Sequence, residues 1–328
     1  MALPSTGAIS LYDVNVELGL SGTTTISMNQ TSVRTLFGVA SGQISMSDGY
    51  GRSNYGNIAT FTSQSSVDWT VPAGIISIWV KMWGAGGRGG TSAGGGGGFI
   101  SGYVAVTPGS TVKIICGFGG FYDSSPEACD PIPFGGSDTV TGGAASVVYY
   151  NSSTYMMAGA GGAGARDAGG AAGGAGGGIN GVNGAGTNGG QGAQGATGGT
   201  GGVASDPNCD STSTNGPNHS APTLIGGNLT FGRDGGNAPG FLVCGDPYFD
   251  CRREGTSGGG GYAGGGGTDT VSGGGGGSSG AANFTDVTNI AGSGATPGGT
   301  SDTDYNGSYG GGGASDINGE QAYVVIRY

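Results

Sequence analysis

Glycine at every third position dominates one stretch of the chain, Gly186-Thr-Asn-Gly189-Gly-Gln-Gly192-Ala-Gln-Gly195-Ala-Thr-Gly198-Gly-Thr-Gly201. The same period precedes it in another register through Gly178, Gly181 and Gly184. A period of three matches the polyproline II helix, which has no internal hydrogen bonds. Collagen shares this period but depends on abundant proline, and residues 159–206 contain none. We therefore expect packed polyglycine II-type helices joined by N–H···O and Cα–H···O bonds; a flexible glycine linker is the alternative.

The amino-acid composition limits how this chain can fold. Glycine makes up 83 of the 328 residues, and hydrophobic residues make up only 35%. A conventional apolar core therefore cannot run the full length of the chain. Because glycine loses the most conformational entropy on folding, an ordered glycine-rich body needs dense backbone hydrogen bonding.

Charge and hydropathy exclude several classes of partner. The chain has 10 basic and 21 acidic residues and a net charge of −11, too few cations for binding to a phosphate backbone. We expect no nucleic-acid partner. Residues 1–7 lack the basic and apolar regions of a secretion signal, and no apolar run approaches the roughly 18 to 20 residues of a membrane span. We expect synthesis in the cytoplasm and no membrane insertion.

Residues 1–53 contain a phrase repeated three times, Ile9-Ser-Leu11, Ile26-Ser-Met28 and Ile44-Ser-Met46. Three residues after each serine stands a side chain that can complete a capping box, which predicts three short helix starts. Glycines 19 and 38 stand where helices end. Two apolar helix faces follow, formed by Leu11, Val14 and Leu18 and by Val33, Leu36 and Phe37. The sequence predicts a small α-helical head; local turns in an extended arm are the alternative.

The second region, residues 54–157, alternates apolar and polar residues as strands do. The expected strands are 61–71 and 76–83, a hairpin of 103–106 with 111–115, and a hairpin of 146–150 with 155–157. The alternating run 322–328 predicts a terminal strand that returns to pair with the first ones. The expected fold is mainly β: a β-sandwich-like module (54–157 with 321–328), a glycine-rich body (158–320) and the helical head.

Catalytic and metal-binding motifs are not evident. A phosphate-binding P-loop requires lysine after its last glycine, but Lys81 and Lys113 both follow valines. His219 is the only histidine and is expected in an exposed loop, which gives little support to zinc sites or Ser-His-Asp catalysis. Asp302 and Asp304 have Ca²⁺-binding chemistry, but a solvated acidic loop is the interpretation we adopt. A polysaccharide depolymerase would need a carboxylate pair, which the sequence does not show. We expect no enzyme, no cofactor and no metal.

The five cysteines fall into different settings. Cys244 and Cys251 enclose six residues and are either a local disulfide or two free thiols. Cys129 and Cys209 lie in other inserts and are candidates for a second bridge. Cys116, in an apolar strand, is expected to be a buried free thiol.

Polar inserts interrupt the glycine-rich sequence at 121–134, 206–224, 247–253 and 302–309. Tyrosine, phenylalanine and arginine supply large contact areas, and loops on a rigid scaffold are where binding is expected. Ordinary surface turns are the alternative. The residues that we predict to contact a receptor are Tyr122, Phe134, His219, Tyr248, Phe249, Arg252, Arg253, Tyr305 and Tyr309.

Parts of the chain resemble proteins of tailed bacteriophages. The opening Ala2-Leu-Pro-Ser-Thr-Gly-Ala-Ile-Ser-Leu11, with 33–38 and 44–51, resembles a segment of phage tail and virion proteins. Trp69-Thr-Val-Pro-Ala-Gly74, with 78–87, 106–109 and 323–328, resembles the glycine-rich domain of tail fibres and spikes. The body with variable inserts is similar to the tip adhesins of T-even-like phages, although those are not expected to begin with this head.

The resemblance implies a non-enzymatic adhesin on the virion, at a tail fibre or tail tip. The head would attach to a phage tail or baseplate protein through Leu11, Val14, Leu18, Val33, Leu36 and Phe37. The inserts would bind an outer-membrane protein or a surface glycan. Fibres are commonly trimeric, which favours a homotrimer, whereas the similar tip adhesins act as single copies. The alternative function is a purely structural baseplate, fibre-connector or capsid-decoration protein.

Overall fold

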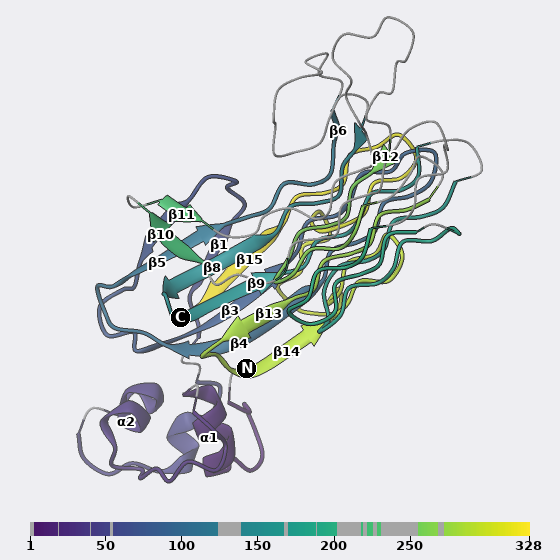
Figure 1. Cartoon of the computed structure of the whole chain (residues 1–328). Coiled ribbons are helices and arrows are strands. Elements are labelled where there is room, and N and C mark those ends of the chain that lie inside the picture. The colour runs from purple at the N-terminus through teal and green to yellow at the C-terminus, as the bar shows by residue number, and fades with distance from the viewer. Residues whose placement is uncertain are drawn as a thin grey trace, which may run out of the picture.

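The computed structural model describes residues 3–18, 20–39, 41–52, 55–123, 139–166, 170–187, 189–201, 218, 222–225, 228–230, 255–267 and 272–328. The fold is mainly β. Figure 1 shows short helices at one end, β-sheets beside them, and long extended segments that run away from the helices to the opposite end.

The N-terminal segment (residues 3–52) contains the helices α1 (Leu11–Glu17) and α2 (Thr31–Phe37) and the 3₁₀ turn η1 (Met46–Gly49). Two of the three predicted helix starts are confirmed. The Asp13 amide donates to the Ser10 hydroxyl at 3.2 Å and the Ser10 amide donates to the Asp13 carboxylate at 2.8 Å, which forms a capping box at α1. Ser45 and Asp48 form the equivalent box at η1.

The middle helix start was predicted wrongly. Helix α2 begins after Gln30, not after Ser27. The Ser27 hydroxyl accepts instead from the amide of Asn29 at 3.3 Å, so it closes a turn and the helix starts three residues later. At the other end Gly38 adopts the predicted left-handed conformation, with φ of 71°. Gly19 lies outside the described residues.

A small apolar cluster holds the N-terminal segment together. Its buried members are Leu3, Val14, Leu18, Val33, Leu36 and Phe37. The two ends of the segment also meet, because the Leu3 amide donates to the Arg52 carbonyl at 2.8 Å and the Tyr50 hydroxyl donates to the Gly7 carbonyl at 2.6 Å. These contacts replace an extended arm with a compact unit.

Two five-stranded antiparallel sheets form the β module. The first has the order β1 (Ile58–Phe61), β15 (Tyr323–Arg327), β3 (Ser77–Trp83), β4 (Phe99–Ala105) and β14 (Thr285–Ile290). The second has the order β13 (Gly280–Ala282), β9 (Thr154–Ala158), β8 (Ser146–Asn151), β5 (Thr111–Ile115) and β2 (Val67–Thr70). One buried cluster takes residues from both sheets, so the sheets pack face to face.

The terminal strand returns as predicted. β15 lies between β1 and β3 and pairs with both. The predicted β8–β9 hairpin is also confirmed. The β8–β9 pairing closes through a short turn at residues 151–154, whereas β15 pairs with strands that lie far away in the sequence.

Two predictions placed neighbouring strand segments together that the structure separates into different sheets. The turn between β4 and β5 exists, with the Ser110 amide donating to the Thr107 carbonyl at 3.0 Å, but the strands belong to different sheets. The alternating run that begins at Phe61 does not continue as one strand: Phe61 ends β1, and Val67–Thr70 form β2 in the opposite sheet. A bend separates them, in which the Ser65 amide donates to the Ser63 hydroxyl at 3.2 Å. Alternation marks a strand but not the sheet that it joins.

Strands β13 and β14 were not expected, because they lie in the predicted glycine-rich body. β14 is largely exposed, and its pairing with β4 is irregular between Thr285 and Thr288. The remaining strands are the pair β10 (Thr223–Ile225) and β11 (Asn228–Thr230), and the small sheet β12 (Gly255–Thr256), β7 (Thr139–Val140) and β6 (Tyr122–Asp123).

The glycine body consists of the described parts of 84–98, 159–201, 257–278 and 310–320, and its backbone bonds follow a period of three. Amides 160 and 163 donate to segment 257–260, amides 161 and 164 to segment 85–88, and amides 162 and 165 to segment 171–174. These six N···O distances are 2.7–3.0 Å. Amides 273–278 divide in the same way among three neighbours, 182–185, 160–163 and 263–266. In its described parts the body is a hydrogen-bonded bundle and not a flexible linker.

Glycine is required where these segments approach each other. A Cβ at Gly162 would overlap the carbonyl oxygen of Gly274, and a Cβ at Gly161 would overlap that of Gly95. The space between segments therefore excludes any side chain at these positions. Alanines 160, 163 and 165 are fully buried at other positions of the same segment, so side chains are accepted only at selected places.

Candidate functional site

The small sheet β12–β7–β6 marks the end of the glycine body that lies farthest from the helices (Figure 1). β6 leads into residues 124–138 and β7 follows them, while β12 follows residues 231–254. Two of the polar inserts therefore begin or end at this sheet. We call this end of the glycine body the distal end.

A pocket of about 290 Å³ opens beside this sheet. Its lining combines strand residues with residues from three segments of the glycine body: Arg88, Gly90, Tyr122, Val140, Arg166 and Asp316. Tyr122 belongs to β6 and Val140 to β7. Residues separated by more than 200 positions in sequence thus share one cavity.

Arg88 is held in place by the loop that carries Asp316. Its guanidinium donates to the Asn318 side-chain oxygen through Nη1 and to the Asp316 carbonyl at 3.1 Å through Nη2. Among the described residues, its buried Nε has no hydrogen-bond partner. The guanidinium carbon lies 5.4 Å from the centre of the Tyr122 ring, a cation–π distance. These contacts fix the orientation of the positive group.

The described residues that line the pocket include more positive than negative side chains, in a chain that is acidic as a whole. Two guanidinium groups and one carboxylate, that of Asp316, line it, whereas the whole chain carries a net charge of −11. Guanidinium groups bind carboxylates and phosphates through paired hydrogen bonds. The arrangement suits a small anionic group and does not resemble an extended basic surface.

The predicted receptor residues fall into three groups. Tyr122 is 40% exposed and lines the distal pocket. Tyr305 and Tyr309 are half-buried on the first sheet, where Tyr305 lies 5.7 Å from Trp83 and Tyr309 stacks on Tyr323 at 4.7 Å between ring centres. The others lie outside the described residues: Phe134, His219, Tyr248, Phe249, Arg252 and Arg253.

Asp302 and Asp304 were interpreted as a solvated acidic loop, and that interpretation was wrong. Lys81 lies 2.8 Å from Asp302 and 2.7 Å from Asp304, and its side chain is only 2% exposed. Arg327 also binds Asp304, at 2.7 Å through Nε. Burial favours the neutral acid, but hydrogen bonds and charges from Arg327 and Lys81 outweigh it and lower the pKa of Asp304. The carboxylates of Asp302 and Asp304 therefore balance the positive charge of the buried Lys81 side chain.

The cysteines and potential metal ligands add no reactive centre in the described residues. Cys116 is buried and free, as predicted, and burial raises the pKa of its thiol to about 12. Cys244 and Cys251 lie outside the described residues, as do Cys129 and Cys209. The described part of the chain contains no group of three or more His, Cys, Asp or Glu side chains placed to hold a metal.

Five of the six residues predicted for virion attachment are core residues of the N-terminal segment. Val14, Leu18, Val33, Leu36 and Phe37 are buried. Leu11, in contrast, is 41% exposed. Two aromatic residues of the segment are also exposed, Tyr12 at 60% and Tyr50 at 42%. The buried residues maintain the shape of this segment, while Leu11 and the tyrosines supply apolar surface.

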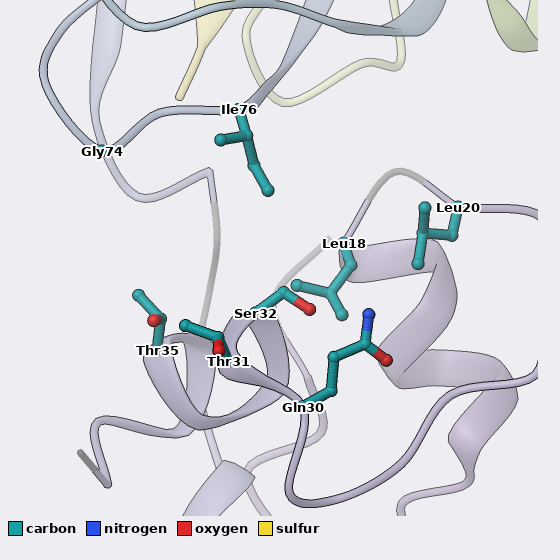
Figure 2. A pocket seen from close by; sticks show the side chains of 8 residues that line it. All are labelled: Leu18, Leu20, Gln30, Thr31, Ser32, Thr35, Gly74 and Ile76. Atoms are coloured by element: carbon teal, nitrogen blue, oxygen red, sulfur yellow. The ribbon is translucent and has the colours of Figure 1, made fainter.

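A second cavity, of about 440 Å³, lies between the helices and the β module. Figure 2 shows the Ile76 side chain of the module pointing toward the helices, opposite Leu18 and Ser32. Gly74 lines the cavity on the module side, and Leu20, Gln30, Thr31 and Thr35 complete the lining on the other. The cavity marks a loosely filled junction between the two parts.

Comparison with known proteins finds no family model that matches the chain and no significant match among curated proteins. Among the described helices, none has the length and apolar character needed to cross a membrane.

Sequence reasoning missed Arg88 and Arg166, which give the distal pocket its charge. One feature of the sequence could have pointed to them: each is a single basic residue inside a glycine- and alanine-rich segment. Their proximity to Tyr122 was not predictable, because it depends on which glycine segments become neighbours.

Proposed function

We propose that this protein is a structural adhesin of a tailed bacteriophage that binds a bacterial surface through its distal end. The observation that carries the proposal is the position of the β12–β7–β6 sheet. Both described ends of residues 124–138 and the C-terminal end of residues 231–254 lie there, at the opposite end of the molecule from the N-terminal segment (Figure 1). Such a bipolar arrangement lets one end attach to a virion while the other meets a cell.

Within this proposal the glycine body is a bundle of polyglycine II-type helices. The support is the period of three in its backbone bonds, by which consecutive amides of 160–165 turn to three different neighbours. Three residues per turn would produce that rotation. The close contact of Gly162 with the Gly274 carbonyl suits the additional Cα–H···O bonds that such packing makes.

The N-terminal segment serves as a small helical head that attaches to a tail or baseplate protein. Its apolar cluster gives it a shape of its own. Leu11 and Tyr12 are exposed at the start of α1, and Tyr50 is exposed beside η1. Exposed aromatic and aliphatic side chains of this kind are the usual anchors of a protein interface.

Adsorption of the labelled full chain to a panel of Gram-negative and Gram-positive strains tests the proposal. We expect saturable, strain-selective binding that excess unlabelled protein competes. Replacing residues 124–138 and 231–254 with glycine-serine linkers should abolish binding. The matched control inserts the same linkers at the exposed turn between Ser152 and Ser153, in the β module, and should bind as the unmodified chain does.

Two results would contradict the proposal. Equal adsorption to every strain would indicate non-specific attachment. Unchanged strain-selective adsorption after both replacements would show that neither insert at the distal end is needed. Infection that does not depend on these inserts would instead favour a baseplate, connector or decoration protein.

A further inference from the structure

The distal pocket has a chemistry that the adhesin proposal alone does not specify. It brings two guanidinium groups, a tyrosine ring and a carboxylate to one cavity in a protein that is otherwise acidic. We propose that this pocket binds one anionic sugar residue of a bacterial surface glycan, with its carboxylate or phosphate group between Arg88 and Arg166. The choice of a bacterial glycan rests on the proposed function; the anion site rests on the pocket itself.

The size of the pocket suits a single sugar ring with one charged substituent. Its volume, about 290 Å³, is at the lower end of the roughly 300–1,000 Å³ found for small-molecule sites. A long polyanion would also meet the repulsion of a chain with net charge −11. Two arginines within a small cavity can still attract one charged group, because the local charge dominates at short range.

Arg88 is oriented before any ligand arrives. Asn318 and the Asp316 carbonyl occupy Nη1 and Nη2, and the described residues offer no partner to the buried Nε. The Arg88 guanidinium has five N–H groups, and these two contacts use one on each terminal nitrogen, so each terminal nitrogen keeps a second N–H. The positive charge is delocalised over the whole guanidinium, so an anion at the pocket is also attracted to it.

The other lining groups suit the remaining parts of a sugar. The Tyr122 ring is 40% exposed and offers an apolar face for the C–H face of the ring. The exposed Asp316 can accept hydrogen bonds from sugar hydroxyl groups. Gly90 leaves its side of the cavity without a side chain. Each chemical part of an acidic sugar therefore has a counterpart.

Titration calorimetry of the full chain with galacturonic acid, galactose 6-phosphate and galactose tests this assignment. We expect at least one of the two anionic sugars to bind about tenfold or more tightly than galactose, with affinity falling as salt rises. The two acids distinguish a carboxylate from a phosphate as the recognised group. Equal binding of galactose would overturn the proposal, as would no binding of either acid at about 10 mM.

Arg166→Gln should weaken binding of the favoured acid about tenfold or more. Arg88→Lys keeps the charge but loses the fork-shaped donor set, and should weaken it too. Lys113→Gln is the matched control, since it removes one positive charge from the β module, where Lys113 pairs with Asp68. Equal loss in Lys113→Gln, or no loss in Arg166→Gln, would overturn the assignment.

Failure of this proposal and failure of the adhesin proposal give different results. Strain-selective adsorption by a chain that binds neither acid removes the pocket assignment and leaves the adhesin. Sugar binding by a chain that adsorbs to no strain leaves the pocket and removes the adhesin.

Discussion

At the scale of single residues, the most consequential electrostatic feature is the ion cluster on the first sheet. Lys81 is buried in β3, and its charge is compensated by Asp302 and Asp304, with Arg327 of β15 completing the group. An isolated buried ammonium would be very costly, so the acidic loop is part of the sheet's stability.

Replacing Asp304 with asparagine should destabilise the fold substantially. The Asp304 side chain is 6% exposed and bridges Lys81 and Arg327. Because Lys81 keeps Asp302 as a partner, we expect a loss of about 3 kcal/mol in the free energy of unfolding, the lower end for a broken buried pair. Chemical denaturation measures it. The control Asp68→Asn breaks the exposed pair with Lys113 and should cost about 1 kcal/mol or less; equal losses would contradict this account.

The same carboxylate predicts how stability changes with pH. The pKa of Asp304 is lowered in the folded state from its ordinary 3.8, so the unfolded chain takes up this proton first as pH falls. Its contribution is complete above about pH 4 and disappears as the pH falls through the lowered pKa. Asp304→Asn should therefore lose less stability than the unmodified protein between neutral pH and pH 3. Parallel acid limbs of the two stability curves would contradict it.

Some residue contacts were predictable from sequence and others were not. The Ser10–Asp13 box depends on a spacing of three residues and was predicted correctly. The Lys81–Asp302 contact joins residues 221 positions apart, and no local pattern marks it. The same limit applies to the meeting of Arg88 with Tyr122.

At the scale of elements, alternation and turns identified most strands of the β module but not their sheets. β15 and the β8–β9 hairpin were placed correctly. The β4–β5 turn was recognised, yet the chain uses it to cross between sheets. Strand β14 has four exposed positions in a row and irregular pairing, so it lacks the alternation that would have revealed it.

The glycine body makes a sharp prediction about alanine. Gly162→Ala would place a methyl group on the Gly274 carbonyl, and backbone cannot move aside as a flexible side chain can. We expect a loss of about 1–3 kcal/mol, as for other overpacked cores, seen as a lower melting temperature. Gly56→Ala is the matched control because its Cβ would meet nothing within 4 Å. Equal melting temperatures for the two variants would contradict close packing of the body.

At the scale of the whole molecule, the sequence predicted a small N-terminal unit, strands and a glycine-rich body. It did not predict that segment 84–98 joins the bundle, since the run lies between two strands and its partners include residues of 159–164 and 310–320. Nor does any sequence pattern indicate which inserts begin or end at the distal end of the glycine body. That arrangement depends on long-range pairing, which residue patterns do not encode locally.

In the proposed adhesin the distal end faces the cell and the N-terminal segment faces away from it. A pair of fusions tests this orientation most directly: a bulky fluorescent protein before Met1, or the same protein inserted within residues 124–138. On a strain that the unmodified chain binds, we predict that the first fusion adsorbs with unchanged affinity and the second does not adsorb. Adsorption of the second fusion together with loss by the first would place the contact at the opposite end and contradict the account.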